Sequence, residues 1–145
     1  MRIFHIAREV DWEQARRTGT YTVSTYGRTL EQEGFIHASR REQVRGVFDA
    51  FYSDVPDRLV LLAIDTDLLT SPWQEEPGGT DVFPHVHGPL NTSAVIGVAR
   101  LDRNGVVEPF GLDFAREVVN RMLLIAAVLF VLAVVVLVLA GTLGG

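Results

Sequence analysis

The chain of 145 residues contains no cysteine and no lysine. The absence of cysteine excludes disulfide bonds, thiolate metal sites and thiol nucleophiles. All 13 cationic side chains are arginines, the formal net charge is −5, and no basic run is present. This balance argues against a surface for nucleic acid, so no DNA partner is expected.

The common phosphate-binding motifs are also missing. The sequence has neither a GxxxxGK[ST] loop nor a GxGxxG loop after a predicted strand. The GxSxG pattern of a nucleophile elbow is absent as well. A site for NAD or another nucleotide would therefore have to be built without those loops.

One long apolar run is present near the C-terminal end. Residues 122–140 read MLLIAAVLFVLAVVVLVLA. A helix of this length extends about 28 Å at about 1.5 Å per residue, close to the hydrocarbon core of a bilayer, about 30 Å thick. We predict a transmembrane helix over residues 121–141, in contact with the lipid bilayer through residues 122–140. A buried core helix is the alternative, but the preceding domain would have to surround a helix that is apolar on all sides.

The charges around this run predict its orientation. Arg116 and Arg121 lie just before it, and no charged residue follows it in the short tail, residues 142–145. The N-terminal segment is too charged for a signal peptide. By the positive-inside tendency we expect a single-pass, tail-anchored membrane protein whose soluble domain lies in the cytoplasm. Residues 105–120 are expected to form a linker and a juxtamembrane helix.

The sequence pattern of residues 1–104 predicts one soluble domain, in which short strands alternate irregularly with two short helices. Asp11 with Gln14 three residues later resembles a capping box that opens the first helix, and Gly19 is expected to end it. This pattern indicates an α+β class or a split mixed sheet rather than a regular crossover fold. The expected strands cover residues 3–6, 20–24, 35–39, 58–65, 73–76 and 93–102, the last with a bulge at Gly97.

The second helix is predicted from Ser39 to about Tyr52. Ser39 and Glu42 have the spacing of a second capping box. Four apolar residues recur at helical spacing, so we expect them to form the buried face of this helix. They are Val44, Val47, Phe48 and Phe51.

The chain has four histidines, and three of them occur near expected strand ends in apolar segments. These three are His5 in FHIA, His37 in GFIHAS and His85 in VFPHVHGPL. A single histidine in such a setting is more often a core group whose nitrogens are bonded than a catalyst. The repeated placement favours a shared site, because an imidazole costs free energy to bury unless its nitrogens find partners.

The segment VFPHVHGPL allows two interpretations. His85 and His87 are two positions apart, so both side chains would point to one face of an extended segment. Pro84 and Pro89 stiffen the chain on either side. The segment is either a rigid turn whose imidazoles bond to backbone carbonyls, or a rigid wall that presents them to a pocket.

Two adjacent carboxylates, Glu75 and Glu76, belong to an expected strand before this segment. They would face opposite sides, so only one can point at the pocket, and both could instead be solvated charges at a loop edge. Three histidines and a carboxylate would suit zinc or non-haem iron. Because no partner that would orient such ligands can be named, no metal is expected.

Five segments, taken together, resemble a small bacterial family, domain of unknown function 952 (DUF952). In order along the chain they read FHIA, W..A...G.Y, EGFIHAS...Q, LVLLAID and FPHVHGPL, and they span residues 1–102. The family is grouped with the ADP-ribosyltransferase superfamily. The resemblance implies a split mixed β-sheet of the ADP-ribosylation type around an NAD-binding cleft. The apolar C-terminal run is an addition to the usual family member.

The resemblance also implies roles for individual residues. His5 matches a position that contacts the NAD ribose, and His37 a position near the nicotinamide. Glu75, preferred over Glu76, would act with His85 on the acceptor or on the oxocarbenium-like centre. These four, His5, His37, Glu75 and His85, are the candidate catalytic residues, and Ser39, Phe83 and His87 are the candidate substrate-binding residues. His87 stands where the family commonly has tyrosine, so a different pH profile is expected.

Three function classes follow from these residues. The first is a membrane-anchored protein whose cytoplasmic domain binds NAD or an ADP-ribosylated substrate and performs ADP-ribosyl-type chemistry. The second is a non-catalytic module, tethered to the membrane, that binds a nucleotide or small metabolite. The third and weakest is a metal enzyme that uses histidine and glutamate. The catalytic interpretation requires His5, His37 and His85 to converge on one cleft.

Overall fold

The structure is a computed structural model, and it describes residues 1–105. The chain divides into two units, Met1–Glu108 and Pro109–Gly145. The first unit has several small sheets and a few short helices, which confirms the α+β class. Within residues 1–105, no helix has the length and apolar character needed to cross a bilayer. The predicted transmembrane helix, residues 121–141, lies outside the described residues.

The central sheet has three antiparallel strands in the order β1-β6-β10. They are β1 (Arg2–Arg8), β6 (Leu59–Asp65) and β10 (Val95–Leu101). The apolar run LVLLAID forms the middle strand, as expected for a segment covered on both faces. The register of β10 shifts between Val95 and Gly97, which confirms the predicted bulge.

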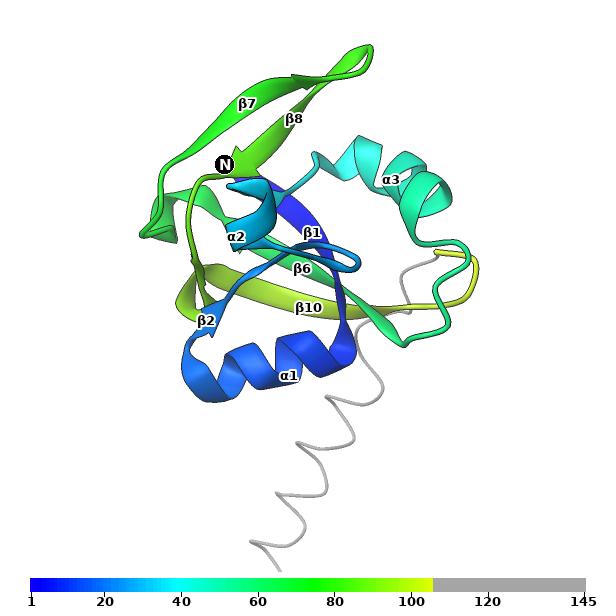
Figure 1. Cartoon of the computed structure of the whole chain (residues 1–145), viewed down its shortest axis with the longest axis horizontal. Helices are drawn as coiled ribbons and strands as arrows, with labels where there is room; N and C mark the ends of the chain where they lie inside the picture. The colour runs from blue at the N-terminus through cyan, green and yellow to red at the C-terminus, as the bar shows by residue number, and fades with distance from the viewer. Residues whose placement is uncertain (106–145) are drawn as a thin grey trace, which may run out of the picture. The chain divides into compact units, whose positions relative to one another are not determined.

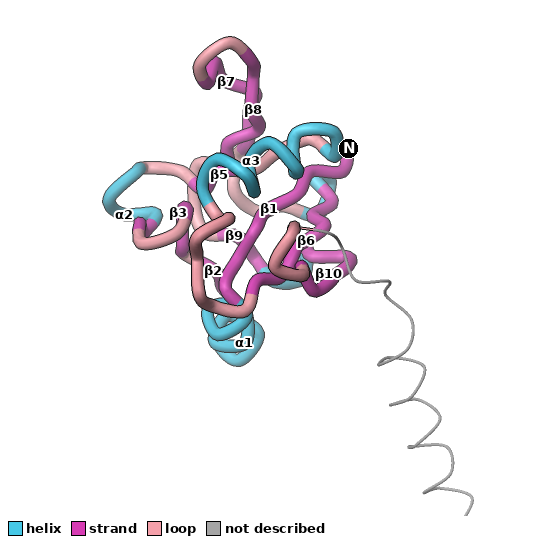
Figure 2. The backbone as a smooth tube through the Cα atoms, turned by 90° about the vertical axis from the view of Figure 1, so that its right-hand side faces the viewer, coloured by secondary structure: helices cyan, strands magenta, loops and turns pink. Residues whose placement is uncertain are grey.

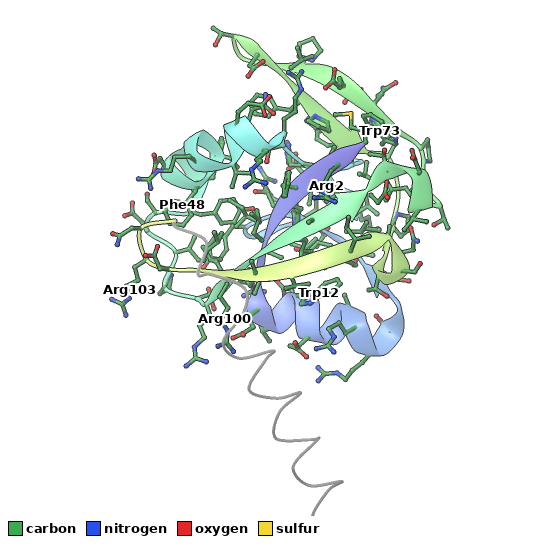
Figure 3. All side chains as sticks on the ribbon, turned by 180° about the vertical axis from the view of Figure 1, so that it is seen from behind. Arg2, Trp12, Phe48, Trp73, Arg100 and Arg103 are labelled. Carbon is green, nitrogen blue, oxygen red and sulfur yellow. The ribbon has the colours of Figure 1, made fainter. Side chains whose placement is uncertain are left out.

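Helices cover both faces of this sheet. Alternate residues of β1 point to opposite sides, so Ile3 and Ala7 join one buried cluster and Phe4 the other. Trp12 of α1 (Glu9–Thr18) belongs to the first cluster, and Phe48 of α3 (Val44–Phe51) belongs to the second. Figure 3 shows these two side chains, Trp12 and Phe48, on the α1 side and the α3 side of the sheet. The strands are therefore held between two separate apolar layers.

A second three-stranded sheet has the order β5-β8-β7. Its strands are β5 (Ile36–His37), β7 (Trp73–Gly78) and β8 (Asp81–Val86). Strands β7 and β8 form a hairpin whose tip is Gly79 and Thr80, because Gly78 pairs with Asp81. The hairpin projects away from the central sheet in both views (Figures 1 and 2).

All named strand pairs within residues 1–105 are antiparallel. The β-structure is therefore split, as expected, but it is not mixed, since a mixed sheet needs a parallel pair joined by a crossover connection. The remaining elements are β2 (Thr20–Tyr21), β3 (Val23–Thr25), β4 (Arg28–Thr29), α2 (Leu30–Glu33), β9 (Leu90–Asn91), and the 3₁₀ turns η1 (Arg41–Gln43), η2 (Thr66–Leu68) and η3 (Thr92–Ala94).

The first helix begins three residues earlier than predicted. The residue before it is Arg8, and Asp11 lies within the first turn. The Asp11 carboxylate accepts from Nε of Arg8 at 2.7 Å instead of capping backbone amides. The end of the helix is as predicted, because Gly19 has φ of 83°, in the left-handed region that favours glycine.

The start of the second helix is also corrected. Ser39 caps nothing, because its backbone pairs with Phe4. The helical turn opens after Arg40, whose N–H donates to Oε1 of Gln43 at 2.8 Å. The predicted buried face is wrong at Phe51, which is 67% exposed. Phe48, one turn earlier, packs in the buried cluster against the sheet, whereas Phe51 does not belong to that cluster.

Candidate functional site

The segment from Ile36 to Ser39 joins the two sheets and brings distant histidines together. On one side, β5 pairs with β8 through Ile36↔Val86 and His37↔His85. On the other side, Ser39 and Phe4 exchange two backbone hydrogen bonds of 2.8 Å. Because His5 follows Phe4 on β1, the backbones that carry His5, His37 and His85 become neighbours.

His5 lies in the middle of β1, not near its end, and is only 3% exposed. Its Nδ1 lies 2.6 Å from the carbonyl oxygen of His37, and its Nε2 lies 2.9 Å from the hydroxyl of Tyr21. A carbonyl only accepts, so Nδ1 carries the proton and Nε2 accepts from Tyr21. Burial lowers the pKa of His5 to about 4. His5 is therefore a neutral ring whose two nitrogens are both used within the protein.

His37 and His85 form an aromatic group with Phe35. The rings of Phe35 and His85 stack with centroids 4.1 Å apart. The His37 ring meets both of them edge-on, at 4.7 Å from Phe35 and 5.1 Å from His85. Burial lowers the pKa of His37, and the neighbouring His85 lowers it further. These mutual contacts restrict the orientations of the three rings.

Glu76 is the carboxylate beside the histidines. Its Oε2 lies 2.5 Å from Nδ1 of His85, and its Oε1 lies 3.4 Å from Nε2 of His87. Gln74 donates to Oε1 at 2.6 Å. The hydrogen bond from His85, and then that from Gln74, lowers the pKa of Glu76. The hairpin register explains this placement. Gln74 stands opposite His85, and Glu76, two residues later on the same strand, points to the same face as Gln74.

Glu75, the preferred carboxylate of the sequence analysis, faces the other side of the hairpin. It stands opposite Pro84, and its Oε1 accepts from Nε of Arg40 at 2.8 Å. The expectation that only one of the two glutamates points toward the histidines is confirmed, but that glutamate is Glu76. The choice depended on which residue of β8 stands opposite each glutamate, and the sequence does not contain that register.

The three candidate substrate-binding residues have different positions. Ser39 lines the cleft described below, but it is 2% exposed and its hydroxyl donates to the carbonyl oxygen of Phe4 at 3.3 Å. Phe83 lines the same cleft and packs over Gly78, where an added Cβ would lie 2.7 Å from the ring. The His87 ring lies 5.8 Å from that of Phe35 and contacts Glu76.

A cleft of about 540 Å³ opens between β1, the β7–β8 hairpin and α3, and His5, His37 and His85 all line it. Sequence reasoning missed its aromatic residues Phe35 and Tyr52. It also missed Phe51, which it placed in the core. The cleft is lined by Phe4, His5, Ile6, Thr25, Phe35, His37, Ala38, Ser39, Val47, Phe51, Tyr52, Pro77, Gly78, Gly79, Phe83 and His85.

Among residues 1–105, no arginine and no carboxylate lines the cleft. Its ionisable side chains are the three histidines and Tyr52, and burial raises the pKa of Tyr52. In the part of the chain that the structure describes, no group of three or more histidine or acidic side chains is placed to hold a metal ion. The cleft is therefore a mostly apolar, aromatic space with imidazole nitrogens on one wall, which suits an uncharged ring with a few polar groups.

The chain is similar to a protein of known structure, CC0527 from Caulobacter crescentus. The crystal structure of that protein shares 30% sequence identity and a TM-score of 0.62, over 74% of this chain and 94% of the other. Its solution NMR structure shares 30% identity and a TM-score of 0.55, over 76% and 93%. No curated protein matches the chain. The sequence model of DUF952, described as a protein of unknown function, matches residues 6–98.

Proposed function

Because the chain belongs to the DUF952 family of proteins of unknown function, we propose that its first unit binds a small molecule in the histidine-lined cleft. The candidate ligand is NAD or an ADP-ribosylated substrate, handled by ADP-ribosyl-type chemistry. One observation carries this proposal. Histidines from three distant segments, His5, His37 and His85, line one cleft whose volume, about 540 Å³, is in the range of small-molecule sites.

The cleft residues would divide the binding of such a ligand between them. The rings of Phe35 and Phe83 offer flat apolar surface to a nicotinamide or a base. The His37 ring takes part in no hydrogen bond within residues 1–105, so its nitrogens are available to ribose hydroxyls. Glu76, rather than Glu75, would supply the carboxylate through His85. His5 supports the carbonyl of His37 and contributes shape rather than a free nitrogen.

The fit to NAD is good for one end of the molecule only. The ring and ribose end meets aromatic side chains and imidazoles. The diphosphate carries negative charge, and no cationic side chain among the described residues lines the cleft. Arg40, which follows the cleft residue Ser39, is engaged with Glu75. The diphosphate would therefore have to remain at the open mouth.

This uncharged lining favours a second candidate, a non-catalytic module that binds a neutral metabolite. His5 is bonded on both ring nitrogens to protein atoms, as expected of a structural histidine. In this case the cleft would recognise a ring and a few polar atoms, and no bond of the ligand would be broken. The two candidates differ in turnover and in the effect of phosphate groups on affinity.

Calorimetric titration and product analysis distinguish them. Full-length protein in detergent is titrated with nicotinamide, nicotinamide riboside, NAD and ADP-ribose, and NAD consumption is followed by chromatography. The ADP-ribosyl proposal expects NAD binding that His37→Ala weakens and Glu13→Gln, on the outer face of α1, leaves unchanged. Binding of the riboside without NAD turnover would support the neutral-ligand module. No binding of any of the four compounds to the folded protein would contradict both.

We also propose that residues 122–140 anchor this domain to a membrane. The support is the uninterrupted apolar sequence of that segment. Cell fractionation followed by alkaline carbonate extraction tests it. The full chain should stay in the membrane pellet, and deletion of residues 122–145 should release the protein. A full chain recovered in the soluble fraction would refute the anchor.

A further inference from the structure

We infer that Glu76 and His85 form a proton-transfer pair, in which Nε2 of His85 exchanges a proton with a hydroxyl of the ligand or with a bound water. Glu76 is the positioning residue of this pair. The inference rests on the proposed function only in taking the cleft as the binding site. It does not require that the ligand be NAD.

Three contacts hold the His85 ring in one orientation. Oε2 of Glu76 lies 2.5 Å from Nδ1, the ring of Phe35 stacks on one face, and His37 meets it edge-on. A carboxylate with a lowered pKa is ionised near neutral pH and can only accept a hydrogen bond. The proton of the neutral ring therefore sits on Nδ1, and Nε2 keeps its lone pair. This is the arrangement in which a histidine acts as a general base.

The free nitrogen of His85 faces the cleft. His85 is a lining residue, and Nε2 has no hydrogen-bond partner within residues 1–105. In that same part of the chain, the hydroxyl of Ser24 is the sole buried side-chain oxygen or nitrogen without a partner. Nε2 of His85 is therefore not fully buried, and it belongs to a ring that lines the cleft. His5 differs, because Tyr21 and His37 occupy both of its nitrogens.

The step consists of one proton moving between two atoms. An O–H bond of the ligand or water breaks, and its proton forms an N–H bond with Nε2 of His85. The ring becomes an imidazolium, whose positive charge the Glu76 carboxylate stabilises through Nδ1–H. The reverse transfer returns the proton from Nε2 to the oxygen that lost it. Since no cationic side chain among the described residues lines the cleft, the ligand class is a neutral, hydroxyl-bearing molecule.

The position of the proton can be measured without any ligand. The full-length protein, labelled with ¹⁵N-histidine and held in detergent, is examined by long-range ¹H–¹⁵N correlation at about pH 8. His85 should be the Nδ1–H tautomer, and Glu76→Ala should shift it toward Nε2–H. The matched control is Glu75→Ala, on the opposite face of the same strand, which should leave the tautomer unchanged. A wild-type His85 in the Nε2–H form would overturn the inference.

A second measurement tests whether Nε2 is reachable and does not depend on a variant that folds. Diethyl pyrocarbonate acylates unprotonated ring nitrogens, and mass spectrometry locates the product. His85 should be acylated in the wild-type protein and His5 should not. A reactive His5 with an unreactive His85 would overturn the inference. Failure of NAD binding would refute the ADP-ribosyl proposal and leave both of these results unchanged, so the two failures are distinguishable.

Discussion

Nδ1 of His85 lies 2.5 Å from Oε2 of Glu76, although the two residues are nine positions apart and belong to opposite strands of a hairpin. The contact ties β7 to β8 by side chains as well as by backbone. It also fixes the orientation of a ring that lines the cleft. The stability of the hairpin and the orientation of the His85 ring therefore depend on the same carboxylate.

Acid should weaken this contribution of Glu76. The folded pKa of Glu76 is lowered below its ordinary value of 4.5, so the stabilisation is complete above pH 4.5 and is lost as the pH falls through the folded pKa. Glu76→Gln should therefore be less stable than the wild type near neutral pH, and the difference should shrink in acid. Urea unfolding at a series of pH values measures it, with Glu75→Gln as control. A difference that grows on acidification would contradict the assignment.

Protonation of His5 should destabilise the fold in a higher pH range. Its folded pKa, about 4, lies below the ordinary value of 6.5, so its contribution is complete above pH 6.5 and is lost between pH 6.5 and 4. The shift corresponds to roughly 3 kcal/mol at the acid end. His5→Asn, which can keep a donor toward the carbonyl of His37, should remove this component of the pH dependence. A His5 resonance that titrates near 6.5 in the folded protein would refute the prediction.

A side chain at position 78 should destabilise the fold. An added Cβ would lie 2.7 Å from the Phe83 ring, so Gly78→Ala must displace a residue of the cleft wall. We expect a loss of about 1–3 kcal/mol in the free energy of unfolding. Gly46→Ala is the matched control, because its Cβ would meet nothing within 4 Å and alanine favours the helix by about 1 kcal/mol. Thermal unfolding of both variants should give shifts of opposite sign, and equal shifts would contradict the steric argument.

Truncation of Phe51 and truncation of Phe48 should have very different effects on the stability of the fold. Phe51 is mostly exposed and lines the cleft, whereas Phe48 is buried in the layer under α3. Phe51→Ala should change the free energy of unfolding by no more than about 0.5 kcal/mol. Phe48→Ala should cost about 3–5 kcal/mol. Chemical denaturation checks both values, and a large loss at Phe51 would show that its ring is part of the core.

Much of the central sheet could be predicted from the sequence. LVLLAID is apolar at every position but the last, and such a run fits a strand covered on both faces, which β6 is. Gly97 marked the bulge of β10, and Gly19 marked the end of α1. These features depend on a single segment, so the local pattern was sufficient. The helix starts were wrong because Asp11 pairs with the side chain of Arg8, the residue before the helix, and Ser39 pairs with Phe4 of β1.

The candidate site could be predicted only in part. The catalytic interpretation required His5, His37 and His85 to converge on one cleft, and all three line the same cleft in the structure. The identity of the carboxylate depended on the pairing of Gln74 with His85, which a two-residue turn at Gly79 fixes. Tyr21 was missed as the partner of His5, although a buried imidazole must have one. The partner belongs to a strand 16 residues away, and no local pattern identifies it.

We expect the short ladder between β5 and β8 to affect how long a ligand stays in the cleft. Two residue pairs and the hydrogen bond from Ala38 N to the Pro84 carbonyl, at 2.9 Å, join the hairpin wall to the segment that carries His37. A local opening of this ladder would release the wall while the centre of β6, at Leu62, stays closed. Amide hydrogen exchange at Ala38 would then be faster than at Leu62, and a molecule bound in the cleft beside His37 and His85 would slow it. In that case the residence time of the ligand would depend on how often this small ladder opens.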